Sequence, residues 1–420
     1  MTKALLHSTS HFHEVGASLA WGTLAGVLLA GCAEPAADPQ PPREIALEAG
    51  EGSAQPHLDV GADGTVLLSW LEPAQDGYAL RLSTTTGDEW SSPATVASGA
   101  DWFVNWADFP SVSPVGEDAL AAHWLVYQQQ GFGYDAVMSL STDGGGSWRE
   151  PFLLHVDGTD SEHGFVTLFP WQDGLAAVWL DGRNMIQDGE FVFENASGEP
   201  VGMSLRYAHF GIDGERLASE EVDELACDCC QTDVAFSGGD ALVAYRDRTT
   251  TEVRDIVLSR LTTEGWQPPV ALAPDNWILE ACPINGPAIA ARGDDVAVAW
   301  FSAADNRPRV NLVRSSDGGH TFADTIEVDT SGSFGHVDVA ALANGETAVS
   351  WLRREGDGLA LALRLISRSG ESGETVTVAF IDVAGPLDFP QMVYDGRQLT
   401  FAWTDFGGVQ QVRTAVVGLN

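Results

Sequence analysis

Four cysteines carry the sharpest chemical signal in this chain. Cys227, Cys229 and Cys230 form a C-x-C-C cluster, and Cys282 follows it at a distance. An even number of cysteines in an oxidising compartment favours two disulfides. A C-x-C-C cluster with one distant cysteine also suits a soft metal ion, copper or zinc. Both interpretations stay open here, although crowded loops strain a disulfide and so leave room for the metal.

A second group of residues has the types that are found in ligand sites. Its members precede short apolar segments, where a loop turns into a strand. They combine aromatic, imidazole and amide side chains, which can orient a ligand, but each could instead cap the end of a strand. Either histidine could also add a nitrogen ligand to the cysteines. The candidates for ligand binding are Trp102, Trp106, His163, Asn285 and His336.

Three arginines and two aspartates permit an enzymatic interpretation. Arg183, Arg246 and Arg248 could clamp a carboxylate through paired hydrogen bonds. Asp108 or Asp181 could then act as acid or base in the cleavage of a glycosidic bond. All of these residue types also form ordinary surface ion pairs. We therefore treat the five as candidate catalytic residues, assign no mechanism and favour a protein without enzymatic activity.

The candidate residues lie in the loops of a repeat that runs through most of the chain. An apolar run that ends in an aromatic residue recurs roughly every fifty residues, after another apolar segment and a Gly/Asp turn. An alternating strand follows each run, and a fourth short strand follows in most copies. Four strands per repeat without helical periodicity are typical of propeller blades. The aromatic residues are Trp70, Trp124, Trp179, Tyr245, Trp300, Trp351 and Trp403.

This repeat predicts an all-β fold, a seven-bladed β-propeller of four-stranded antiparallel blades over residues 44–420. The last copy ends after three strands, and an unpaired strand, Glu44–Glu48, precedes the first copy. That N-terminal strand can supply the missing outer edge of the last blade and close the ring. Six blades is the alternative, because the interval between Trp179 and Tyr245 is longer than the others.

Two loops share a turn of the form S-x-D-x-G-x-x-W/F. They are Ser141–Trp148 and Ser315–Phe322, and Ser83–Trp90 is a degenerate copy with threonine in the aspartate position. The carboxylate can accept backbone N–H groups across its own turn, while the glycine takes positive φ and the ring folds back between sheets. These turns resemble the Asp box, or BNR repeat, of sialidase-like propellers. The resemblance implies that Asp143 and Asp317 are structural rather than catalytic.

The resemblance covers residues 44–420 and is specific for the fold rather than for an activity. Sialidases of this type carry an arginine triad, a Tyr–Glu nucleophile pair and an aspartate acid/base. They also carry a Phe/Tyr-Arg-Ile-Pro string near the start, which this chain lacks. The chain is also similar to uncharacterised secreted bacterial proteins labelled exo-sialidase, through the strings 102–110 and 227–232. Because a fold does not fix a function, that label implies only an alternative, an exo-acting glycoside hydrolase of sialidase type.

The repeat places most of the candidate residues on one face. In a four-stranded blade the loops before the first strand, and those between the second and third strands, lie opposite the Asp-box turns. Loops of several blades then converge on one axis, which is a common place for a ligand. We therefore expect a binding module that takes a glycan, a protein or a metal at its channel mouth. A structural scaffold in an envelope complex is a third class.

The N-terminal region has the features of a targeting sequence rather than of a part of the fold. Residues 17–31 are apolar, uncharged and too short to span a membrane, as in a signal peptide over residues 1–31. They end in Leu-Ala-Gly-Cys, which resembles the bacterial lipobox and implies lipidation of Cys32. An ordinary cleavable signal with a chance cysteine is the alternative. Residues 32–43 then form a Pro-rich tether.

Charge and targeting together limit the partners. The chain has 21 Lys and Arg against 60 Asp and Glu, a formal net charge of -39. A surface this acidic repels phosphate backbones, so nucleic acid is excluded as a partner. The expected location is the bacterial cell envelope, with the membrane reached through the lipid anchor and with a glycan or an envelope protein as the partner.

Overall fold

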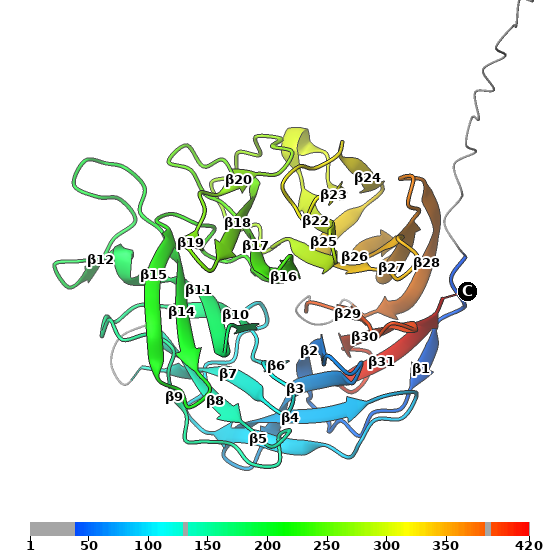
Figure 1. Ribbon diagram of the computed structural model, residues 1–420, viewed down its shortest axis with the longest axis horizontal. Coiled ribbons are helices and arrows are strands. Elements are labelled where there is room, and N and C mark those ends of the chain that lie inside the picture. Colours follow the sequence, from blue (N-terminus) through cyan, green and yellow to red (C-terminus); the bar gives the residue numbers. More distant parts are fainter. Residues whose placement is uncertain (1–37, 129–132, 383–387, 420) are drawn as a thin grey trace, which may run out of the picture. The chain divides into compact units, whose positions relative to one another are not determined.

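The computed structural model describes residues 38–128, 133–382 and 388–419. Seven antiparallel sheets of at least four strands follow one another around a central axis (Figure 1). The seven-bladed β-propeller predicted from the repeat is therefore confirmed. Within each blade the chain moves outward strand by strand, and the last strand of one blade leads to the first strand of the next.

The first four blades use residues 54–271. Blade 1 contains β2 (Ala54–Val60), β3 (Val66–Ala74), β4 (Gly77–Thr85) and β5 (Ala94–Gly99). Blade 2 contains β6 (Ser111–Pro114), β7 (Leu120–Tyr127), β8 (Tyr134–Ser141) and β9 (Phe152–Leu153). Blade 3 contains β10 (His163–Trp171), β11 (Gly174–Asp181), β14 (Ser204–Gly211) and β15 (Arg216–Asp223). Blade 4 contains β16 (Asp233–Ser237), β17 (Asp240–Arg246), β18 (Ile256–Thr262), β19 (Gly265–Trp266) and β20 (Val270–Ala271).

The remaining blades complete the ring. Blade 5 contains β21 (Ala288–Arg292), β22 (Asp295–Ser302), β23 (Arg309–Ser315) and β24 (Ile326–Asp329). Blade 6 contains β25 (Ser333–Ala341), β26 (Thr347–Glu355), β27 (Gly358–Ile366) and β28 (Ser372–Ile381). Blade 7 contains β29 (Gln391–Tyr394), β30 (Gln398–Asp405) and β31 (Gln411–Gly418), with β1 (Arg43–Ile45) as its outer strand.

The N-terminal strand closes the ring as predicted. β1 pairs antiparallel with β31, with Glu44 opposite Ala415. The strand is shorter than the predicted Glu44–Glu48 and begins one residue earlier. Because the first ordered strand belongs to the last blade, blade 7 cannot be completed without the N-terminal end of the propeller, and β31 is no longer an edge.

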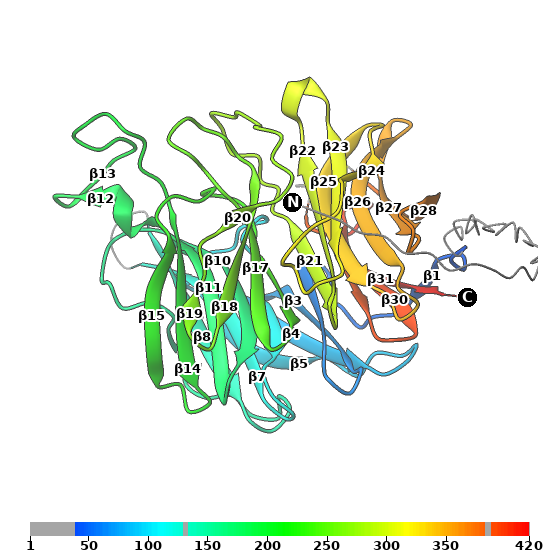
Figure 2. The same cartoon turned by 45° about the horizontal axis from the view of Figure 1, so that its top comes forward.

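The long interval between Trp179 and Tyr245 has a local cause. Between β11 and β14 the chain forms a short 3₁₀ helix, η1 (Gly182–Met185), and a hairpin of β12 (Ile186–Gln187) and β13 (Glu190–Phe191). This insertion projects from the rim of blade 3 (Figure 2). It lengthens one repeat without adding a blade, so the six-bladed alternative is wrong.

The core lies between neighbouring sheets. The repeated aromatic residues pack there, and Trp70, Trp179 and Trp351 are fully buried. The second strand of each blade is buried on both faces, which is why its sequence reads as a continuous apolar run rather than as an alternation. The described part of the chain contains no helix that is long and apolar enough to cross a membrane. Residues 1–31 and Cys32 lie outside the described residues.

The two complete S-x-D turns form the expected contacts. Asp143 Oδ1 accepts a hydrogen bond from the Ser147 amide at 2.8 Å, and Asp143 Oδ2 accepts one from the Ser147 hydroxyl at 2.7 Å. Asp317 makes the equivalent contacts with Thr321 at 2.9 and 2.6 Å. Trp148 and Phe322 pack against the clusters between blades. Both carboxylates therefore hold their own turns.

We expect Asp143→Asn to lower the thermal midpoint by a few degrees at pH 7. Hydrogen bonds from Ser147 and Ser141 lower the pKa of Asp143 to about 2. A carboxyl group whose pKa is lower in the folded chain stabilises the fold above its ordinary pKa of about 4, and this contribution is lost as the pH falls through the folded pKa. Circular dichroism melts should show the two proteins converging as the pH drops from about 4 to about 2. A deficit that persists at the lowest pH would contradict the prediction.

Candidate metal centre at the mouth of blades 4 and 5

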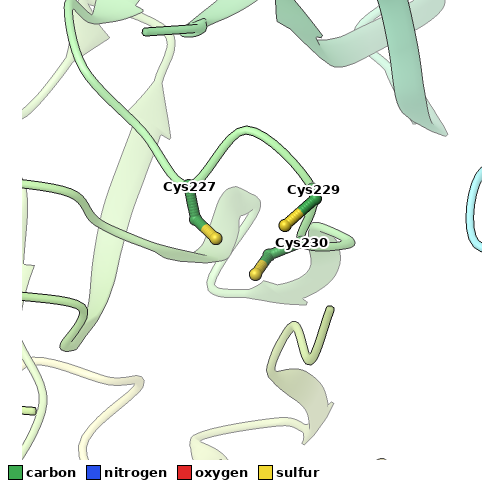
Figure 3. A group of neighbouring side chains, drawn as sticks. All are labelled: Cys227, Cys229 and Cys230. Carbon is green, nitrogen blue, oxygen red and sulfur yellow. The ribbon is translucent and has the colours of Figure 1, made fainter. Parts of the chain in front are cut away.

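The four cysteines meet at one place. The sulfur atoms of Cys227, Cys229 and Cys230 lie within 4.8 Å of one another and point toward a common centre (Figure 3). The side chain of Cys229 also interacts with that of Cys282, which comes from the loop before blade 5. The chain therefore brings three sulfur atoms together and places a fourth cysteine, distant in sequence, beside Cys229.

The backbone fixes the three-cysteine turn before the first strand of blade 4. The Cys227 amide donates to the carbonyl of Arg246, the last residue of β17, at 2.9 Å. The Asp228 carboxylate accepts the Met203 amide at 2.7 Å, which ties the turn to blade 3. The Gln231 side chain donates to the carbonyl of Ala107 in the loop before blade 2. Anchors in several blades therefore hold the turn in place.

The disulfides expected from the even number of cysteines are not formed in the structure, where all four cysteines are free. The geometry gives a reason. The sulfur of Cys229 lies within 4.8 Å of those of both Cys227 and Cys230, and its side chain also interacts with Cys282, so it does not face one partner. A disulfide requires two sulfur atoms to pair exclusively, whereas a metal ion gathers several thiolates at once.

Two buried arginines flank the sulfur cluster. Arg246 and Arg254 have only 2% and 3% of their surface exposed. All three guanidinium nitrogens of Arg246 donate to backbone carbonyls, those of Asn285, Arg254 and Phe301, at 2.6–2.8 Å. Arg254 donates from Nη2 to Glu252 at 2.7 Å, but its Nε and Nη1 find no partner among the described residues. Unpaired buried donors are costly, so they favour negative charge nearby.

The buried arginines and the neighbouring thiols shift the pKa values of the cysteines. Burial would raise the pKa of Cys227, but donors from Cys229 and Cys230 and the charges of Arg246 and Arg254 outweigh it and lower the pKa well below the usual value. The contact from Cys229 lowers the pKa of Cys282 as well. Contacts with the other cysteines raise the pKa of Cys229, and burial raises that of Cys230. Since the thiolate is the form that binds metals, the surroundings favour Cys227 and Cys282 as the first ligands. Cys282 is exposed and Cys229 is half-buried, so the cluster can be reached from solvent.

Two of the predicted ligand-binding residues are tryptophans with different surroundings. Trp102 is buried and stacks on Trp124 at 5.4 Å, so it belongs to the core between blades 1 and 2. Trp106 is half-buried, stacks with Phe389 at 6.2 Å and lines a pocket of about 310 Å³. Only Trp106 of the pair offers a face to a ligand.

Three polar residues form clasps, that is, hydrogen bonds that link one blade to the next. Asp108, Asn285 and Asp388 each accept a backbone amide from a residue of the next blade with positive φ, respectively Phe165, His336 and Gln55. The close approach explains Gly335, since a Cβ there would lie 1.9 Å from Asn285 Oδ1. The ring of His336 is buried against Phe389 at 4.1 Å. Burial raises the pKa of Asp108 to about 7 and lowers that of His336 to about 4.

The three candidate arginines are each paired within the chain. Arg183 binds Asp181 with Nε and Nη2 at 2.7 and 2.6 Å. Arg248 bridges Asp228 and Glu252, and Arg246 is saturated by carbonyls as described above. Asp181 is fully buried between Arg183 and the indole N–H of Trp179. The carboxylate clamp suggested by the sequence therefore has no free guanidinium among these three.

His163 lies in a different cluster from the cysteines. It stacks on His155 between the carboxylates of Asp135 and Asp157. Sequence reasoning missed the other three residues. A signal was present, because polar side chains alternate along His155, Asp157, Thr159, Ser161 and His163 and so share one side of an extended chain.

The central channel contains a third polar set. The innermost strands line a space of about 1390 Å³ that includes Asp59, Asp233 and Asp338. Asp233 accepts the Ile289 amide and Asp338 accepts the Met392 amide, both at 2.7 Å, so each links two blades. Burial raises the pKa of Asp59 to about 6, of Asp233 to about 7 and of Asp338 to about 8.

Comparison with known proteins agrees with the fold. The polysaccharide lyase Uly1 has a TM-score of 0.50 at 8% identity, over 90% of this chain and 92% of that chain. A protein of unknown function from Dyadobacter fermentans has a TM-score of 0.49 at 14% identity, over 92% of this chain and 100% of that chain. NanB sialidase from Streptococcus pneumoniae has a TM-score of 0.44 at 12% identity, over 90% of this chain and 71% of that chain. No family model and no curated protein matches the chain. At such identities the likeness extends to the fold alone.

Proposed function

We propose that this chain is a metal-binding β-propeller that holds a soft ion, copper(I) or zinc, at the mouth of blades 4 and 5. One observation carries the proposal: the sulfur atoms of Cys227, Cys229 and Cys230 lie within 4.8 Å of one another, with Cys282 beside Cys229, and none of the four forms a disulfide. Thiolate sulfur selects such ions over hard cations.

The charge balance supports the same ion. Zinc bound by four thiolates, or copper(I) bound by three, carries two net negative charges. Arg246 and Arg254 bring two positive charges to the cluster, and their fields already favour the Cys227 thiolate. Two donors of Arg254 lack acceptors. A metal–thiolate centre would supply negative charge beside these donors and so offset their desolvation.

Metal titration of the reduced protein tests the proposal. We expect the thiols of the full chain, purified without oxygen, to bind one equivalent of zinc, or of copper(I), in competition with a chromophoric chelator, with the thiol-dependent part of the binding measured as the difference from the four-serine variant. Replacement of Cys227, Cys229, Cys230 and Cys282 by serine should abolish that binding, because the serine hydroxyl is a poor ligand for soft ions. Bound metal should also protect the four thiols from a thiol reagent.

The controls separate loss of ligands from loss of fold. Cys32→Ser removes the remaining cysteine of the chain and should leave the bound metal unchanged. Circular dichroism should show native strand content in the four-serine variant. If the folded, reduced wild-type protein binds neither ion, or if the four-serine variant binds as many equivalents of metal as the wild type, the proposal is overturned.

Glycan binding is the second candidate, favoured by one observation. The pocket of about 310 Å³ contains the aromatic side chains of Trp106, Tyr78 and Phe406 at the surface, and aromatic-lined clefts of this size suit small ligands. The exo-glycosidase alternative has less support, since Arg183, Arg246 and Arg248 are already paired. A fluorogenic sialoside would report such an activity directly.

The location proposed with this function is the outer side of a bacterial cell envelope. Support comes from the apolar stretch 17–31 and the lipobox-like string that ends at Cys32. A lipid at Cys32 and the tether 32–43 would hold the propeller near a membrane, where a glycan or an envelope protein could approach it. Mass spectrometry of the mature N-terminus tests for the lipid.

A further inference from the structure

A second group of metal-ligating side chains lies where blade 2 meets blade 3. The imidazole rings of His155 and His163 are stacked, with centroids 3.4 Å apart and planes within 3°. Both rings are buried, with 3% and 0% of the side chains exposed. The carboxylates of Asp135, Asp157 and Asp181 lie around them. This group is separate from the cysteine ligands proposed above.

One edge of the stack faces an anchored carboxylate. Asp157 Oδ1 lies 2.7 Å from His155 Nδ1 and 3.2 Å from His163 Nε2. Asp181 Oδ2 lies 3.8 Å from the same nitrogen of His163. Arg183 donates to Asp181 and also approaches Asp157 at 3.3 Å. This edge already contains a cation, so a metal ion is unfavourable there, but its carboxylates can accept N–H groups from both rings.

The opposite edge is incomplete. His155 Nε2 is buried and has no hydrogen-bond partner among the described residues. It lies 3.3 Å from Asp135 Oδ1. His163 Nδ1 lies 3.8 Å from the same oxygen and 3.3 Å from the backbone carbonyl oxygen of Tyr134, a contact that a metal ion at Nδ1 would replace. The two ring nitrogens and the Asp135 oxygen are within 4.8 Å of one another. A buried nitrogen without a partner is costly, unless something not yet in place accepts its lone pair.

Charge identifies what is missing. Three carboxylates against the single guanidinium of Arg183 leave two uncompensated negative charges when both rings are neutral. Protonation of both rings would balance them, but it would place two positive rings 3.4 Å apart, where like charges repel. One divalent cation balances the group and leaves both rings neutral, which is the state in which histidine binds metals.

We propose that His155 Nε2, His163 Nδ1 and a carboxylate oxygen of Asp135 bind a divalent first-row metal ion such as zinc. Asp157 and Asp181 then hold the opposite N–H groups and so fix the orientation of the rings, as carboxylates behind metal-bound histidines commonly do. Two imidazoles and one carboxylate favour such ions over copper(I). Because each lone pair lies in its ring plane, binding tilts the two rings out of their parallel stack.

Zinc binding by the four-serine variant tests this site independently of the first. The variant with serine at Cys227, Cys229, Cys230 and Cys282 should still bind one equivalent of zinc, measured by elemental analysis after gel filtration. Adding His155→Ala should abolish this binding. His320→Ala, which removes an exposed histidine from a turn of blade 5, should retain it. Cobalt in this site should show ligand-field bands without the thiolate charge-transfer bands expected of the cysteine centre.

The outcomes separate the two proposals. Loss of zinc on His155→Ala with the thiol-dependent metal retained supports this site alone. If the four-serine variant fails to fold, His155→Ala in the wild-type chain should lower the bound zinc by one equivalent. A folded four-serine variant that binds no zinc, or unchanged binding after His155→Ala, overturns the proposal.

Discussion

Replacement of Arg246 by methionine should lower the free energy of unfolding by about 4 kcal/mol, because it leaves several buried acceptors without a donor. The guanidinium donates to the carbonyls of Asn285, Arg254 and Phe301 at 2.6–2.8 Å. It also lies 5.0 Å from the centre of the Trp277 ring. Methionine fills similar space without donors, so the loss reports the hydrogen bonds that join blades 4 and 5. Urea unfolding followed by tryptophan fluorescence measures it.

The matched control is an exposed arginine. Arg413→Met removes a side chain that is 45% exposed and 3.6 Å from Asp405, and it should change the free energy of unfolding by less than about 0.5 kcal/mol. Arg246→Lys, which keeps a charge but has a different donor geometry, should fall between the two. If Arg246→Met is as stable as Arg413→Met, the assignment of Arg246 to the fold fails. An activity lost on mutating Arg246 would therefore not by itself identify a catalytic arginine.

The architecture could be predicted from the sequence because it depends on local patterns that repeat. Each blade has an apolar second strand that ends in an aromatic residue, and this period survives the insertion after Trp179. The turns at Asp143 and Asp317 satisfy their own backbone, so their contacts follow from the motif alone. The pairing of β1 with the last blade could be predicted because the last copy of the repeat has only three strands.

The site could be predicted only in part, because side-chain partners depend on which loops meet. The cysteines were identified from their type and C-x-C-C pattern, and Cys227 and Cys282 stand as far apart in sequence as Tyr245 and Trp300, which puts them at equivalent points of adjacent blades. The role of Arg246 was not, since its acceptors are backbone carbonyls that carry no sequence signal.

The hydrogen bonds that act as clasps between blades had a sequence signal that our sequence analysis overlooked. Asp108, Asn285 and Asp388 each stand two residues before a proline, at the same point of three repeats. Equal position in several blades indicates a contact that the fold repeats, whereas a ligand site usually uses different residues in each blade. The structure gives all three the same kind of partner, the backbone amide of a residue with positive φ in the first strand of the next blade.

Stability should depend on pH through the carboxylates of the central channel. Asp338 accepts the Met392 amide at 2.7 Å, and burial, reinforced by the charge of Asp233, raises its pKa to about 8. The folded chain then holds a proton that the unfolded chain has released between about pH 4 and pH 8. The stabilising contribution is therefore complete below about pH 4 and is lost progressively as the pH rises to about 8.

Asp338→Asn should reveal this dependence as a difference from the wild type. At pH 5 the variant should be the less stable protein, because an amide cannot accept from the amides of both Met392 and Val339 as a carboxyl group can. Between pH 5 and pH 9 its deficit should shrink by about 3 kcal/mol, less than the full shift implies because the channel keeps part of the group in contact with solvent. Urea unfolding at several pH values measures the difference. Asp143→Asn supplies the contrast, since its deficit should change only under acid conditions. A deficit of Asp338→Asn that stays constant from pH 5 to pH 9 would mean that the channel carboxylate is ionised throughout, with a cation in the channel as the simplest source of compensation.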